Sequence, residues 1–237
     1  MHQHTDTEDV LKAKEAFKAC AQERGVTIKH YHCDNGIFRS RDFVHHAHRK
    51  KQTVTFCGVD AHHQNGIAEH RIRQLSDSAR TQLLHAMTHN PNQVTAQLWP
   101  HALKHANHLF NALPRTGNDF SPEQLFSGSK ADPQIGEIHP FGCPACVLKS
   151  KLAHQAKQRR WQSRARLGAY LGPSPHHSST VGLILNKDAG YISPQYHCTC
   201  DDYFETPKLE GNASSHWQTL ARIQEQDFCD KDFDTHC

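Results

Sequence analysis

The chain has 237 residues, enough for one large or two small domains that each bury a core. Its 27 Lys and Arg barely exceed its 24 Asp and Glu, but residues 207–237 hold three basic and six acidic side chains, so the remainder is distinctly positive. That distribution favours a polyanionic partner over a membrane, and no apolar run approaches the roughly 18 residues that a membrane span needs. Nine irregularly spaced cysteines, and a start without signal-peptide features, predict a soluble intracellular protein with free thiols.

The first part of the chain predicts alternating helices and strands. A helix is expected over Glu8–Arg24, with Thr7 as its cap and Gly25 as its end. The stripe expected to be buried consists of Val10, Ala13, Phe17, Cys20 and Ala21. The elements expected next are a strand over Val26–Tyr31 that delivers Asp34 to its end, a helix over Asp42–Arg49 and a strand over Thr53–Phe56.

A long helix is expected after the Gly58–Gly66 loop. Glu69, Arg73 and Arg80 lie around its polar face. Asn65 is placed to cap it, where free backbone N–H groups can bind phosphate. The stripe expected to be buried follows the 3-4 spacing of a helix and consists of Ala68, Ile72, Leu75, Ala79, Leu83 and Ala86.

Two further helices complete this α/β part, which is expected to end near Ala131. One covers Val94–Leu113, with Trp99 facing inward despite Pro100. The start of the other is Ser121-Pro122-Glu123-Gln124, which combines a Ser cap, Pro at the first helical position and Gln at the third.

From His139 the pattern changes to short β-type runs separated by Gly, Pro and Ser turns, which predicts a small antiparallel barrel. Between Leu148 and Leu167 the chain carries seven Lys or Arg and no acid. The expected organisation is therefore a domain over 1–131, a second over 139–206, and an acidic, poorly ordered tail over 207–237. The expected strands are Ala145–Leu148, Ala165–Leu171, Val181–Leu185 and Tyr191–His197.

Two acidic residues are candidate metal ligands. Asp34 stands in Asp34-Asn35-Gly36 after an expected strand, and Glu69 stands in Gln64-Asn65-Gly66-Ile67-Ala68-Glu69 at the start of the long helix. Alone, the Asp-Asn-Gly motif indicates a turn, and a carboxylate near a helix start is commonly found there because it interacts favourably with the helix dipole. Together, beside basic residues, the two carboxylates can hold a hard divalent cation, which indicates metal-assisted phosphoryl transfer on nucleic acid.

These sequence motifs strongly resemble the second half of the integrase catalytic core of copia-type retrotransposons. The resemblance covers roughly residues 10–206, and the Gln-Asn-Gly-Ile-Ala-Glu motif is its most specific part. It continues through Leu98-Trp99-Pro100, Asn111-Ala112-Leu113-Pro114-Arg115, Ser121-Pro122-Glu123-Gln124-Leu125-Phe126, His139-Pro140-Phe141-Gly142-Cys143, Trp161, Tyr170-Leu171-Gly172 and Ser193-Pro194-Gln195-Tyr196-His197.

The resemblance implies an α/β fold: a ribonuclease-H-like integrase core that lacks its first strands, followed by a small all-β SH3-like barrel. Such integrases hold two Mg²⁺ ions with three acids. Asp34 matches the second acid and Glu69 the third, so both are expected to be catalytic and metal-binding, with Mg²⁺ or Mn²⁺ as the cofactor. The first acid belongs to an earlier strand, whereas Asp6 and Asp9 stand at a helix start. The chain is therefore expected not to catalyse strand transfer by itself.

The resemblance also implies DNA as the partner, DNA integration as the parent activity, a homo-oligomeric assembly and a nuclear location. His70 stands where the family usually carries Lys or Arg, which lowers the positive charge there. The residues expected at the DNA are Gln64, Asn65, Arg71, Arg73, Lys157, Arg159 and Arg160.

Zinc is not expected. Cys143 and Cys146 form one thiol pair at short spacing, but Cys143 belongs to the Phe-Gly-Cys-Pro word of the resemblance, where no metal is implied. Cys198 and Cys200 alternate along an expected strand and so share one side of it. Two alternatives to a truncated integrase stay open: a non-enzymatic DNA- or RNA-binding remnant, and a partly folded relic without activity.

Overall fold

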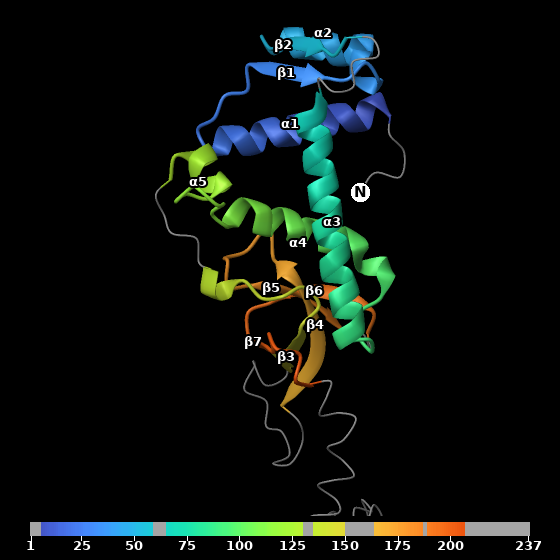
Figure 1. The fold of residues 1–237 in the computed structure, drawn as a ribbon, viewed down its shortest axis with the longest axis vertical. Coiled ribbons are helices and arrows are strands. Elements are labelled where there is room, and N and C mark those ends of the chain that lie inside the picture. Colours follow the sequence, from blue (N-terminus) through green and yellow to red (C-terminus); the bar gives the residue numbers. More distant parts are fainter. Residues whose placement is uncertain (1–5, 59–64, 130–134, 150–163, 187–188, 207–237) are drawn as a thin grey trace, which may run out of the picture. The chain divides into compact units, whose positions relative to one another are not determined.

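The structure is a computed structural model that describes residues 6–58, 65–129, 135–149, 164–186 and 189–206 (Figure 1). The chain divides into two compact units: Met1–Leu84 with Ala96–Ile138, and His85–Thr95 with His139–Cys237. The helices are α1 (Thr7–Glu23), α2 (Arg41–Arg49), α3 (Gly66–His89), α4 (Trp99–Ala112) and α5 (Pro122–Ser127), with short 3-10 turns η1 (Ile37–Arg39), η3 (Ala96–Leu98) and η4 (Ile135–Glu137). The strands are β1 (His30–Cys33), β2 (Thr53–Phe56), β3 (Pro144–Leu148), β4 (Ala165–Pro173), β5 (Gly182–Asn186), β6 (Tyr191–Gln195) and β7 (Cys198–Cys200).

In the first unit, β1 and β2 form a two-stranded parallel sheet, with His30 opposite Thr53 and Cys33 opposite Phe56 (Figure 1). The prediction for β2 is confirmed, whereas β1 begins four residues later than the expected strand and runs up to the residue before Asp34. The β-branched Val26 and Ile28 therefore do not start the strand. Ile28 instead accepts, through its carbonyl, a hydrogen bond of 2.9 Å from the Gln52 side chain.

The buried face of α1 differs from the prediction. Ala21 is buried as expected, but Phe17 is 51% exposed and Lys14 is only 6% exposed. The Lys14 ammonium donates to Gln52 Oε1 at 2.8 Å and stands 5.0 Å from the centre of the Tyr31 ring. A long side chain with an aliphatic stem and a satisfied polar end can thus occupy a core position that apolar periodicity alone does not assign. The helix is capped by Asp6, which accepts from the Glu8 N–H at 3.0 Å, and not by Thr7.

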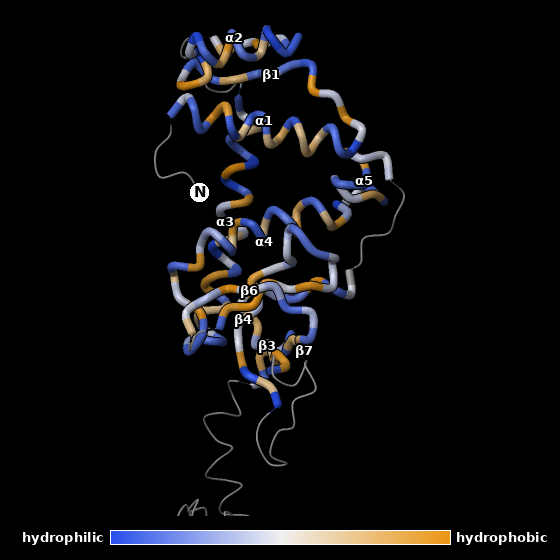
Figure 2. Tube along the Cα trace, turned by 180° about the vertical axis from the view of Figure 1, so that it is seen from behind, coloured by the Kyte–Doolittle hydropathy of each residue, from blue (hydrophilic) through white to orange (hydrophobic). Residues whose placement is uncertain are grey.

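Helix α3 is buried only in its second half. Ala79, Leu83 and Ala86 are buried, as the stripe predicted. Ala68 is exposed and Ile72 is 66% exposed, so the first turns depart from the prediction. In Figure 2 these turns alternate between hydrophilic and hydrophobic colours, and Ile67 is 90% exposed. Arg71, in the same turns, contacts the Phe110 ring of α4, so the face of these turns that meets another element is not the apolar stripe that periodicity predicted.

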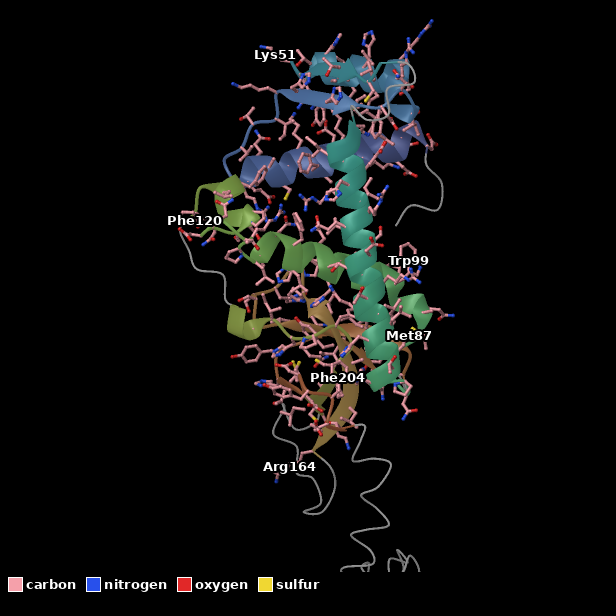
Figure 3. All side chains as sticks on the ribbon, in the orientation of Figure 1. Lys51, Met87, Trp99, Phe120, Arg164 and Phe204 are labelled. Carbon is pink, nitrogen blue, oxygen red and sulfur yellow. The ribbon has the colours of Figure 1, made fainter. Side chains whose placement is uncertain are left out.

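Helices α4 and α5 of the first unit follow the predicted pattern, with two departures in α4. The segment expected as one helix over Val94–Leu113 is split into η3 and α4, because Pro100 lies in the first turn of α4. Trp99, labelled in Figure 3, is 50% exposed, so its predicted inward position is wrong. The capping box of α5 is confirmed: Ser121 accepts from the Gln124 N–H at 3.2 Å, and Gln124 Oε1 accepts from the Ser121 N–H at 2.7 Å.

The second unit contains a five-stranded antiparallel sheet in the order β6-β5-β4-β3-β7. The predicted antiparallel β unit is confirmed, with β7 as a separate strand where one continuous run over Tyr191–His197 was expected. Within the described chain, β6 and β7 are the sheet edges and do not pair with each other, so no closed barrel is formed by these strands. The core contains Val147, Tyr170, Ile184 and Phe204, the last of which is labelled in Figure 3.

Gly142 joins this sheet to the last turns of α3. Its φ is +73°, and a Cβ added there would stand 2.5 Å from the Ala86 Cβ. Its N–H donates to the Tyr170 carbonyl at 2.7 Å and its own carbonyl accepts from Asn90 Nδ2 at 3.0 Å. Only glycine combines this backbone conformation with such a close approach to a helix.

Candidate metal and nucleic-acid site

Asp34 lies at the carboxyl end of β1, directly after Cys33, and is exposed. Its Oδ1 accepts from the Gly36 N–H at 3.3 Å, which closes the turn that the Asp-Asn-Gly word predicts. The neighbouring Asn35 donates through Nδ2 to the Cys57 carbonyl at 2.7 Å. Because Cys57 directly follows β2, this bond fixes the turn to the end of the second strand and so positions Asp34 at one edge of the parallel sheet. The role of Asn35 was not predicted.

Glu69 lies in the first turn of α3 and is exposed. A carboxylate there interacts favourably with the positive end of the helix dipole. Its neighbours Ala68 and His70 are exposed too. The carboxylate is therefore open to solvent and accessible to an ion. Asn65, directly before the helix, is half-buried.

The two carboxylates have the donor chemistry of a hard-cation site. Mg²⁺ and Mn²⁺ prefer carboxylate oxygen and retain several water ligands, so one or two acids from the protein can suffice for binding. In the part of the chain that the structure describes, no three His, Cys, Asp or Glu side chains gather into one potential metal site. Asp34 and Glu69 match Mg²⁺ because both offer carboxylate oxygens as ligands.

Arg71 follows Glu69 by two residues on α3 and is half-buried. Its guanidinium carbon lies 3.7 Å from the centre of the Phe110 ring, and that of Arg115 lies 3.6 Å from the same centre. Arg73 is exposed. Sequence reasoning proposed Arg71 and Arg73 but missed Phe110 and Arg115, because a contact between α3 and the end of α4 leaves no periodic signal in the sequence.

The predicted basic run connects two adjacent strands. β3 and β4 pair with Leu148 opposite Ala165, and the Lys149 N–H donates to the Arg164 carbonyl at 3.0 Å. The ends of the run therefore lie side by side. Arg164, labelled in Figure 3, is exposed. The candidate residues Gln64, Lys157, Arg159 and Arg160 lie outside the described residues.

The cysteines considered as zinc ligands occupy the core and surface of the second sheet. Cys143 is buried, Cys198 and Cys200 pack against the core beside it, and Cys146 is exposed. The hydrogen bond to Cys143 is the main cause that raises the pKa of Cys200, and that to Cys200 is the main cause for Cys198, with burial adding to both. The thiols of Cys198 and Cys200 are therefore held protonated, as neutral side chains packed against the core.

The described helices include none that combines the length and apolar composition needed to cross a bilayer.

No family model and no curated protein matches this sequence. Among solved structures, the chain is similar to one in the cryo-EM structure of the simian T-cell lymphotropic virus intasome in complex with the PP2A regulatory subunit B56 gamma. The TM-score is 0.42 and the sequence identity 16%, over 84% of this chain and 66% of that chain. The chain thus spans slightly less than two thirds of the length of its neighbour.

Proposed function

We propose that this chain is an integrase-derived, nucleic-acid-binding protein of the copia type, in which Asp34 and Glu69 are the metal-binding carboxylates. The observation that carries the proposal is the position of these two acids. Each lies exposed at the end or start of a regular element, within the sequence word that matches the integrase core. Exposed carboxylates at element ends are accessible to both a metal ion and a phosphodiester.

The chemistry of the parent family explains why these residue types would be retained. A bound Mg²⁺ supplies Lewis-acid activation of water or of a DNA 3′-hydroxyl for attack on a phosphodiester. Asp34 is held for this role by the turn at the end of β1, which Asn35 fixes to β2. Glu69 is oriented by the first turn of α3. In this role the two carboxylates would hold the ion, and Arg71 and Arg73, which follow Glu69, would contact the substrate backbone.

Nucleic-acid binding is favoured as the activity of the isolated chain. Arg71 and Arg73 follow Glu69 on α3, and the basic run between β3 and β4 adds a second group of cations. Contacts of this kind neutralise phosphates without reading bases, so they require no third carboxylate. Binding can thus persist without strand transfer, which is the non-enzymatic alternative. The antiparallel sheet is assigned to an SH3-like domain in the same proposal, and homo-oligomers are expected as in integrases.

Binding of a short labelled DNA duplex by the 237-residue chain, followed by fluorescence anisotropy at several salt concentrations, tests this function. If about five cations engage, log K against log[salt] has a slope near −4 to −5, from about −0.9 per phosphate. Replacing Lys157, Arg159 and Arg160 together by alanine should weaken binding and make the slope shallower by about 2 to 3. A chain that binds no DNA at low salt contradicts the proposal, and an unchanged slope in the triple variant removes the basic run from it.

A further inference from the structure

Arg71 and Arg115 contact the same aromatic ring from two different elements. Their guanidinium carbons lie 3.7 and 3.6 Å from the centre of the Phe110 ring. At such distances neither can be at the ring edge, where the ring's own atoms would keep a carbon about 5 Å from the centre. Two guanidinium groups cannot occupy one face at this height together. They therefore stack on opposite faces, with Phe110 between them.

This arrangement holds two positive charges close together. Both guanidinium carbons lie within 3.7 Å of one point, so they are no more than about 7 Å apart. Partial burial lowers the pKa of Arg71, and the charge of Arg115 lowers it further. The site is thus a concentration of positive charge that an anion would relieve.

No described carboxylate neutralises the pair. The ion pairs found among the described residues involve neither arginine, whereas Arg24 of the same unit is paired with Glu123 at 3.0 Å. Arg71 donates one hydrogen bond, from Nη1 to Gln74 Oε1 at 2.8 Å. A guanidinium has five N–H donors, so most donors of the pair are available to a ligand.

The surrounding contacts fix the pair before any ligand binds. Gln74 orients Arg71 from the next turn of α3. The backbone of Arg115 is held in a turn, because its carbonyl accepts from the Asn118 N–H at 2.9 Å. Phe110 restricts both guanidinium planes. Less side-chain freedom is then lost on binding than with two isolated surface arginines.

We propose that Arg71 and Arg115, held on the two faces of Phe110, form a preorganised binding site for the phosphodiester backbone of nucleic acid. The choice of nucleic acid over another anion rests on the proposed function. Arginine forks match phosphate oxygens in a two-donor geometry, and two forks on one ring can contact successive phosphates of one strand. Because the contact is to the backbone, the site binds without sequence preference.

The test measures the affinity of the full chain for a short labelled DNA duplex at several salt concentrations. Arg71→Ala and Arg115→Ala should each lower affinity roughly eightfold at 0.1 M salt and make the slope shallower by about 0.9. Arg49→Ala removes the same charge from an exposed position on α2 outside the pair and should change affinity less than about twofold, because an exposed charge that contacts no phosphate is largely screened. Phe110→Leu keeps the net charge and should still lower affinity roughly threefold, because the ring no longer holds the arginines.

Circular dichroism checks that each variant is folded, and the exposed position of Arg115 makes Arg115→Ala the variant least able to disturb the fold. If the wild-type chain binds DNA and Arg115→Ala behaves like Arg49→Ala, the paired site is overturned while the proposed function stands. If Phe110→Leu binds as tightly as the wild type, the ring does not organise the arginines and the proposal also fails. A wild-type chain without DNA affinity overturns both.

Discussion

Replacing Gly142 by alanine should destabilise the second unit by two separable effects. The positive φ of +73° costs an L-residue about 1–2 kcal/mol. The new methyl group would also lie 2.5 Å from the Ala86 Cβ, an atom attached rigidly to α3 that cannot rotate away. Overpacking of this kind costs about 1–3 kcal/mol. We therefore expect a total loss of about 2–5 kcal/mol in the free energy of unfolding.

Gly190→Ala is the matched control. Gly190 also has a positive φ, of +67°, but a Cβ added there has no neighbour within 4 Å. It should show only the backbone cost, so the two variants should differ by about 1–3 kcal/mol, or roughly 2–4 °C in Tm for each kcal/mol. Thermal unfolding by circular dichroism measures the difference. In the double variant Ala86→Gly with Gly142→Ala, part of the loss should be recovered as a coupling energy. Equal Tm values for Gly142→Ala and Gly190→Ala would refute the close contact between α3 and the sheet.

Three further predictions concern the first unit. Asn35→Ala should cost about 1 kcal/mol of stability through the lost 2.7 Å bond to the Cys57 carbonyl, as measured by denaturant unfolding, whereas no change would show that the turn does not depend on it. Ser121→Ala should cost about 1 kcal/mol through the lost cap of α5 in the same assay, and unchanged stability would show that this cap contributes nothing. Burial, followed by the Lys14 charge, lowers the pKa of His46 below its ordinary 6.5 despite Glu15, and Arg49 and Lys50 act in the same direction. As the pH falls, the unfolded chain therefore binds this proton before the folded chain does. The contribution of His46 to the free energy of unfolding is fully present above pH 6.5 and is lost as the pH drops toward the lower pKa of the folded state. His46→Asn should flatten this pH dependence, as measured by denaturant unfolding at several pH values.

Local signals in the sequence predicted much of the fold. Helix α2 and the capping box of Ser121 and Gln124 follow from short motifs whose hydrogen bonds are made within a few residues, and strand β2 follows from a short run rich in β-branched residues. The antiparallel strands of the second unit were likewise indicated by alternating apolar runs and turns. Composition and spacing therefore predict where these helices and strands lie, although the strands pair with partners distant in sequence, such as β3 with β7.

Long-range contacts were not predictable in the same way. The burial of Lys14 depends on Gln52 and on the Tyr31 ring, which come from distant parts of the sequence. The helical stripe containing Ile72 predicted burial, because periodicity reports an apolar face but not whether another element covers it. For the candidate site, Asp34 and Glu69 came from sequence words, whereas the stacking of Arg71 and Arg115 on Phe110 required the structure.

The central claim is that Asp34 and Glu69 bind one divalent cation, and a Mn²⁺ titration followed by electron paramagnetic resonance tests it most directly. The full chain should bind Mn²⁺, and Asp34→Asn and Glu69→Gln should each weaken that binding by roughly tenfold or more. Asp77→Asn, an exposed acid on the same helix as Glu69, should leave it unchanged. Because both acids contribute to one site, the double variant should be little weaker than either single variant. Binding that is insensitive to Asp34→Asn and Glu69→Gln, or that falls equally with Asp77→Asn, would contradict the account.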